Sequence, residues 1–147
     1  MTGSSTPLAA DEATSPVDAL HGAWSFFESG RATEAASLCR TILRSDAAQP
    51  DALYLLGVFA CENGNVRDAL ELFRKAALAR PQFPEAHYYL GLIHMRQAQH
   101  EQAASHYRQA IAAYPGYSAA WFALGSVLES ENDLSAAADA YQQSVST

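Results

Sequence analysis

A pattern of small, apolar and aromatic residues recurs every 34 positions along this chain. The pair Leu56-Gly57 returns as Leu90-Gly91 and again as Leu124-Gly125. Further positions of the segment 50–83 return with the same spacing: Ala52 as Ala86 and Ala120, Ala69 as Ala103 and Ala137, Phe73 as Tyr107 and Tyr141, Ala76 as Ala110, and Pro81 as Pro115. A fixed period of this length indicates a stack of like supersecondary units, because one unit cannot bury both of its faces alone.

Prolines and glycines divide each period and predict two helices in it. A first helix should begin at a proline, whose missing N–H costs nothing in the first turn, and end near a residue that tolerates the left-handed conformation. The expected starts are Pro16, Pro50, Pro84 and Ser118, and the expected ends are Gly30, Gly64, Ala98 and Asn132. Because alanine is the exception among these ends, the turn at Ala98 is expected to be looser. Second helices should start near Thr33, Arg67, Glu101 and Ser135.

The recurring Leu-Gly, alanine, aromatic and proline positions resemble the tetratricopeptide repeat family, whose unit also has 34 residues. The resemblance implies an all-α fold, a right-handed α-solenoid of four helix–turn–helix units with eight helices. The expected solenoid covers residues 16–147, and residues 1–15 are expected to form a disordered tail. Its repeats should be 16–49, 50–83, 84–117 and 118–147, of which the first departs most, with Gly22-Ala23 at the Leu-Gly position and Cys39 at the aromatic position.

The glycines of the Leu-Gly pairs are expected to let two helices approach closely. Each glycine should face a small residue of the second helix, and the aromatic residue should fill the wider end of the wedge between the helices. The small residues are Ala69, Ala103 and Ala137, and the aromatic residues are Phe73, Tyr107 and Tyr141.

Stacked helix pairs curve into a superhelix whose concave face is the usual binding surface of a solenoid. The resemblance implies that the first helix of each pair lines this face, and helical spacing of three and four selects the positions that point into it. The candidate peptide-binding groove consists of Trp24, Tyr54, Leu55, Val58, Glu62, Glu85, Tyr88, Tyr89, Leu92, Met95, Arg96, Phe122 and Glu129. In the alternative interpretation, some of these side chains pack against neighbouring repeats and belong to the core.

The groove candidates are apolar and aromatic at the centre and mostly acidic at the edge, where Arg96 is the exception. Rigid aromatic side chains often dominate binding energy, and an acidic rim steers basic segments. The expected partner is therefore a protein or peptide that is apolar and carries basic residues. Family members that hold a chaperone's C-terminal carboxylate use Lys, Asn and Arg on this face, whereas Leu20, Trp24, Leu55, Glu85 and Tyr89 stand here.

Composition and motifs argue against several other functions. The net charge of −7 argues against binding to nucleic acid, which usually requires a basic face. The five histidines and the two cysteines, Cys39 and Cys61, show no spacing typical of a metal site, and no nucleophile or phosphate-binding motif is present. The expectation is a protein that is not an enzyme and has no cofactor or metal. The apolar run 52–61 is too short to span a membrane, so a cytoplasmic location is expected.

The last repeat suggests two further functions. Its second helix has no following helix to cover it, so Leu134, Ala138, Tyr141 and Val145 are expected to leave an exposed apolar patch. Self-association through this helix is one alternative. The other is a recruiting arm of a larger enzyme, because arrays of this kind resemble the N-terminal arms of glycosyltransferases and sulfotransferases.

Overall fold

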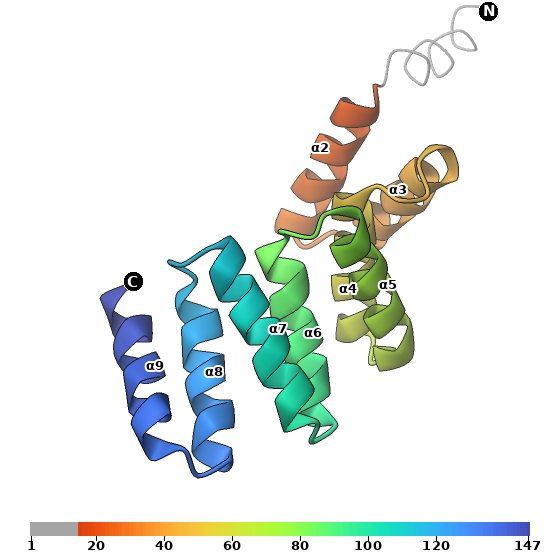
Figure 1. Ribbon diagram of the computed structural model, residues 1–147. Coiled ribbons are helices and arrows are strands. Elements are labelled where there is room, and N and C mark those ends of the chain that lie inside the picture. Colours follow the sequence, from red (N-terminus) through yellow and green to blue (C-terminus); the bar gives the residue numbers. More distant parts are fainter. Residues whose placement is uncertain (1–14) are drawn as a thin grey trace, which may run out of the picture.

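The computed structural model describes residues 15–147, and the predicted tail lies outside this range except for Ser15. The described helices are α2 (Pro16–Glu28), α3 (Ala32–Ser45), α4 (Pro50–Glu62), α5 (Val66–Ala79), α6 (Pro84–Arg96), α7 (His100–Ala113), α8 (Ser118–Ser130) and α9 (Leu134–Ser146). They pack as successive pairs, and each pair contacts the next along the stack (Figure 1). No strand occurs between residues 15 and 147, so the predicted all-α solenoid of four helix–turn–helix units is confirmed.

Every first helix begins at its predicted residue. Pro16, Pro50 and Pro84 occupy the first turns of α2, α4 and α6. The orphan N–H groups of such a turn need acceptors. The Ser15 hydroxyl accepts the Asp18 N–H at 3.1 Å, and the Gln49 side chain accepts the Ala52 N–H at 2.8 Å. Local chemistry at the helix start thus fixes where each repeat begins.

The four turns inside the repeats share one geometry. Their central residues all adopt a left-handed backbone: Gly30 with φ 80°, Gly64 with φ 78°, Ala98 with φ 58° and Asn132 with φ 66°. The following N–H bonds back to the helix at 2.8–2.9 Å in every turn, from Arg31 to Phe26, Asn65 to Ala60, Gln99 to His94 and Asp133 to Leu128. The looser turn expected at Ala98 is therefore not found, because the backbone bonds hold alanine in the conformation that glycine adopts elsewhere.

Ala98→Gly is expected to raise the free energy of unfolding by roughly 1 kcal/mol, because a left-handed conformation is strained for a residue with a Cβ. Urea unfolding of both proteins measures the change. The matched control is Gln97→Gly, one residue earlier, where φ is −89° and glycine only adds freedom to the unfolded chain. Equal effects of the two substitutions would contradict the assignment of strain to Ala98.

The glycines of the Leu-Gly pairs lie against aromatic rings. A Cβ added to Gly57 would come within 2.7–2.9 Å of the Phe73 ring, and one added to Gly125 within 2.8–3.1 Å of the Tyr141 ring. At Gly91 the added atom would overlap the Tyr107 ring. The expectation that these glycines face alanines is thus corrected, because the ring is the nearest neighbour. The missing side chain makes room for an aromatic ring at the centre of each pair.

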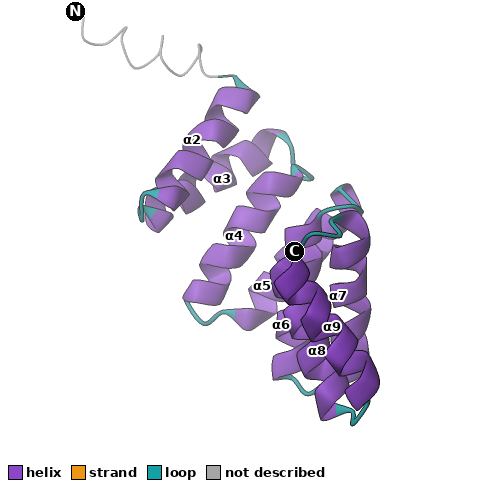
Figure 2. Cartoon of the chain, turned by 90° about the vertical axis from the view of Figure 1, so that its left-hand side faces the viewer, coloured by secondary structure: helices purple, strands orange, loops and turns teal. Residues whose placement is uncertain are grey.

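The apolar core forms two clusters that meet at α6. The first extends from α2 to Leu90 and Ile93 of α6. The second is built on α7, α8 and α9, with Tyr88, Leu92 and Met95 of α6 packed against it. Figure 2 shows α4 between the α2–α3 pair and the block formed by α6 to α9. The helix α6 therefore joins the two halves of the solenoid.

Candidate functional site

Two hollows lie along α6 and share part of their lining. The first lies between α4 and α6, has a volume of about 560 Å³, and is lined in part by Val58, Tyr89 and Arg96. The second lies against α6, α8 and α9 and has a volume of about 530 Å³, with Phe122 in its wall. Leu92 and Met95 line both hollows, so the two are adjacent, and together they are called the α6 groove below.

The structure brings eight of the predicted groove residues to the α6 groove. All lie on the first helices of repeats two, three and four. They are Val58, Glu62, Tyr88, Tyr89, Leu92, Met95, Arg96 and Phe122. Cys61 and Val66 also line the first hollow. Val66 belongs to α5, a second helix, whereas the predicted groove uses first helices only. Only the packing of α5 beside α6 reveals that residue.

The other five predicted residues lie outside the lining of both hollows. Leu55 is 2% exposed and Tyr54 is 9% exposed, so both belong to the core. Glu129 accepts a hydrogen bond from the Tyr141 hydroxyl at 2.8 Å, so its carboxylate is engaged at α9. The remaining two are Trp24, which packs against the first core cluster, and Glu85, which is exposed on α6.

Core rings hold the aromatic wall of the α6 groove in place. Tyr89 stacks on Phe73, with ring centroids 5.0 Å apart and planes 18° apart. Tyr88 contacts Tyr89 edge to face at 5.9 Å and lies 5.2 Å from the Tyr117 ring. Tyr54 in turn lies 5.8 Å from both Phe73 and Tyr89. Rings that are fixed before binding lose little conformational freedom when a partner arrives.

The two cysteine thiols both have a raised pKa. Burial raises the pKa of the Cys61 thiol, with the Arg96 charge acting in the opposite direction. Burial also raises the pKa of the Cys39 thiol to about 11. Both thiols therefore stay protonated near neutral pH, whereas a nucleophilic cysteine needs a lowered pKa. Between residues 15 and 147, no cluster of three or more His, Cys, Asp or Glu side chains is arranged to hold a metal ion.

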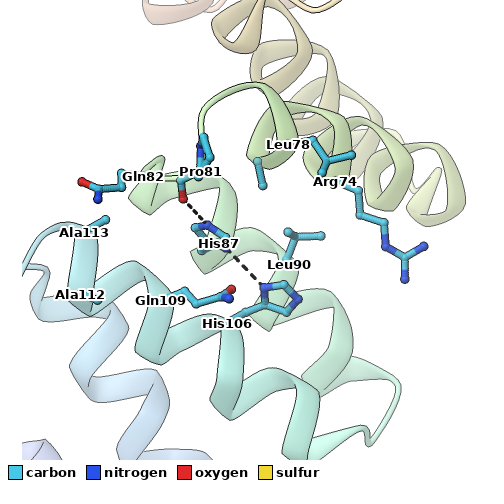
Figure 3. Close-up of a pocket in the computed structure, with 11 residues that line it drawn as sticks. Arg74, Leu78, Pro81, Gln82, His87, Leu90, His106, Gln109, Ala112 and Ala113 are labelled. Atoms are coloured by element: carbon cyan, nitrogen blue, oxygen red, sulfur yellow. Dashed lines mark hydrogen bonds between the residues drawn. The ribbon is translucent and has the colours of Figure 1, made fainter.

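A third pocket, of about 650 Å³, lies between α5, α6 and α7 outside the α6 groove (Figure 3). His87 and His106 face each other in its wall, with their Nδ1 atoms 3.4 Å apart. His94 lies beside them, its ring parallel to that of His106 with centroids 5.4 Å apart. The spacing of the five histidines along the sequence does not by itself distinguish these three from the others. Comparing the same position in successive repeats would have singled out these three.

The sequence model of the tetratricopeptide repeat matches residues 21–66, 60–117 and 93–146. The chain belongs to the tetratricopeptide repeat family. The matches cover nearly all of the described residues, so the family named from the Leu-Gly, alanine and aromatic positions is confirmed. No curated protein matches this tetratricopeptide repeat chain. Within the described residues, no helix has the length and apolar character needed to cross a bilayer.

Solved structures of other repeat proteins share this fold. A crystal structure of MamA matches with a TM-score of 0.80 and 20% identity, over 97% of this chain and 82% of that one. PilF of Pseudomonas aeruginosa matches with a TM-score of 0.77 and 20% identity, over 88% of this chain and 60% of that one. An O-GlcNAc transferase of Thermobaculum terrenum matches with a TM-score of 0.71 and 29% identity, over 80% of this chain but only 22% of that enzyme. Tetratricopeptide repeat folds of this kind are typical of protein–protein interaction scaffolds.

Proposed function

We propose that this protein is a non-catalytic interaction module that holds a segment of a partner protein in the α6 groove. The adjacency of the two hollows carries the proposal, because Leu92 and Met95 line both of them. Two adjacent apolar hollows can receive successive side chains of one extended or helical segment. Aromatic walls fixed by core rings add contact area at low entropic cost.

The charge of the protein favours a partner segment that carries basic residues. The chain has a net charge of −7. Glu62 of α4 and Arg96 of α6 both line the groove, and Glu85 is exposed on α6. Asp51, at the start of α4, is instead paired with Arg80 at 2.7 Å. The remaining acidic groups give a field that speeds the encounter with cationic segments, and their effect weakens as salt rises.

Leu92→Lys is expected to weaken partner binding by about tenfold or more, because it puts a charge at the point where the hollows join and repels a basic ligand. The probe is a displayed library of random peptides selected on the wild-type protein, followed by affinity measurement of the enriched peptides. These peptides should combine apolar side chains with Lys or Arg. The matched control is Leu78→Lys on α5, which is 82% exposed and lies outside the groove, so that affinity should change little.

Two results would reject parts of the proposal. Equal binding to wild type and Leu92→Lys, with circular dichroism showing both folded, would exclude the α6 groove as the site. Enriched peptides that are acidic or lack basic residues would reject the charge preference while leaving the groove in place.

Similarity to part of an O-GlcNAc transferase favours a second candidate function, the recruiting arm of a larger enzyme of the glycosyltransferase or sulfotransferase class. In this case the α6 groove would hold the enzyme's protein substrate. A catalytic domain joined to this repeat array in the gene would favour this function over an independent scaffold.

Exposed apolar side chains on α9 favour self-association as a third candidate. Leu134 is 62% exposed and Val145 is 79% exposed. Tyr141 is only partly exposed, because its ring packs on Gly125. A mass that rises with protein concentration in sedimentation equilibrium would support this function.

A further inference from the structure

The third repeat carries three histidines where its neighbours carry apolar residues. His87 takes the position of Leu53 and Trp121, which lie 34 residues before and after it. His94 takes the position of Ala60 and Leu128, and His106 takes that of Leu72 and Ala140. The three side chains come together between α6 and α7 and are called the histidine stack below. A titratable cluster thus replaces an apolar contact inside one helix pair.

Hydrogen bonds fix which nitrogen of each ring carries a proton. His87 Nε2 donates to the Pro81 carbonyl at 2.8 Å, as the Trp121 indole donates to the Pro115 carbonyl at 2.8 Å one repeat later. In neutral His87 the Nδ1 atom is therefore an acceptor, and the bond between the two Nδ1 atoms takes its hydrogen from His106. A second proton, at His87 Nδ1, would remove that acceptor, and the bond drawn in Figure 3 could then persist only with the His106 proton moved from Nδ1 to Nε2.

Where the structure describes it, the pocket wall beside the histidine stack holds no carboxylate that could balance added positive charge. The rings of His87 and His94 lie 5.7 Å and 5.4 Å from that of His106. Apart from the histidines, Arg74 of α5 is the one charged side chain among the described residues that line this pocket. Its ion-pair partner Glu71 lies 3.6 Å away and is exposed on α5. The remaining polar neighbours are uncharged: Gln109 on α7, Gln82 in the α5–α6 loop, and Gln99, whose Oε1 accepts from His94 Nδ1 at 2.6 Å.

Burial, then the charges on His87 and His94, lower the pKa of His106 to about 4, and a hydrogen bond with Gln109 acts in the opposite direction. An unfolded histidine has a pKa of about 6.5. The folded protein therefore binds this proton more weakly than the unfolded chain. The stabilisation is complete above about pH 6.5 and is lost as the pH falls toward 4.

We propose that the histidine stack makes the α6–α7 pair a pH-sensitive joint, which is closed near neutral pH and opens locally in mildly acidic solution. The histidine stack lies where the two apolar clusters meet, since the buried residues of the first cluster end on α6 and those of the second begin on α7. Opening at this place would part the two halves of the solenoid between α6 and α7, and it would uncover the contact between Gly91 and the Tyr107 ring. Because α6 also carries Leu92 and Met95, acid would weaken the α6 groove as well, a consequence that rests on the proposed function.

Hydrogen exchange followed by mass spectrometry tests the joint directly, with no ligand present. Between pH 7.5 and pH 5.5, the protection factors of the α6 and α7 amides should fall about tenfold, which is the effect of one histidine whose pKa is lowered as that of His106 is. The protection factors of α2 and α3 should change less. A triple variant with the residues of the fourth repeat, His87→Trp, His94→Leu and His106→Ala, should lose this pH dependence. The control is His100→Gln, since His100 bonds Ser130 outside the stack and its removal should leave the pH dependence intact.

Several outcomes would overturn the proposal of a pH-sensitive joint. It is rejected if the triple variant keeps the pH dependence, if His100→Gln abolishes it, or if all helices lose protection together. Should the triple variant not fold, His106→Ala decides alone, because alanine stands at this position in the fourth repeat, and the pH dependence must shrink. A groove that binds no peptide would leave this test unaffected.

Discussion

Gly91→Ala is expected to destabilise the protein by about 1–3 kcal/mol or more, although alanine is intrinsically the better helix former. The added Cβ would overlap the ring of Tyr107, which is 1% exposed and enclosed by the second cluster. Neither the ring nor the helix can move away without disturbing that cluster. Guanidinium unfolding followed by circular dichroism measures the change.

Gly22→Ala is the matched control for this prediction. Gly22 also lies inside a first helix, but the nearest atom to an added Cβ is Leu38 Cδ2 at 3.2 Å, the end of a flexible side chain. The stability should therefore change by less than about 1 kcal/mol in either direction. A loss as large as that of Gly91→Ala would show that contact with the aromatic ring is not the cause.

The first repeat shows how the clash at Gly91 can be relieved. Ala23 and Cys39 stand there at the glycine and aromatic positions, and both are 0% exposed. Tyr107→Cys by itself should cost several kcal/mol, roughly as other aromatic truncations do. The double variant Gly91→Ala, Tyr107→Cys should cost less than the sum of the single variants by about 1 kcal/mol or more. Additivity within ~0.5 kcal/mol would contradict a direct contact between the two positions.

Phe73→Ala is expected to lower the free energy of unfolding by about 3–5 kcal/mol, the usual cost of emptying a buried aromatic site. The Phe73 ring is 0% exposed, lies over Gly57 and stacks on Tyr89 at 5.0 Å. Its loss should therefore also release Tyr89, and peptides that bind the α6 groove should bind more weakly. Guanidinium unfolding and peptide affinity measure the two effects.

Phe122→Ala is the control for the loss of a phenyl ring. Phe122 is 60% exposed and contacts Tyr141 at a ring distance of 5.2 Å. Its truncation should cost less than about 1 kcal/mol of stability, yet it should weaken peptide binding because the ring lines the groove. Equal losses of stability in Phe73→Ala and Phe122→Ala would mean that burial does not set the cost.

The fold was predictable because its signals are local and repeated. Pro16, Pro50 and Pro84 mark helix starts through backbone chemistry, and the helices begin there. Ala98 shows the limit of such reasoning. Its residue type argues for a different turn, but the bond from the Gln99 N–H to the His94 carbonyl is the same as in the other repeats. The backbone bonds of the turn thus override the preference of one residue.

The candidate site was predictable only in part. Helical spacing identifies the side chains on one face of a helix, and three of those it selected, Tyr88, Leu92 and Met95, line the α6 groove. It does not show how closely the next helix approaches that face. Tyr54 has the same spacing on α4, but the rings of Phe73 and Phe83 cover it. Exposure depends on neighbouring repeats, which spacing within one helix does not describe.

The sequence by itself determined the repeat length, the helix starts and the family, because each follows from residue types at fixed intervals. The tertiary structure decided which residues line the groove and which support it. It also decided that Gly91 meets a ring and that His87, His94 and His106 share one site. Those properties depend on distances between residues of different helices, and these distances are set only when the helices pack.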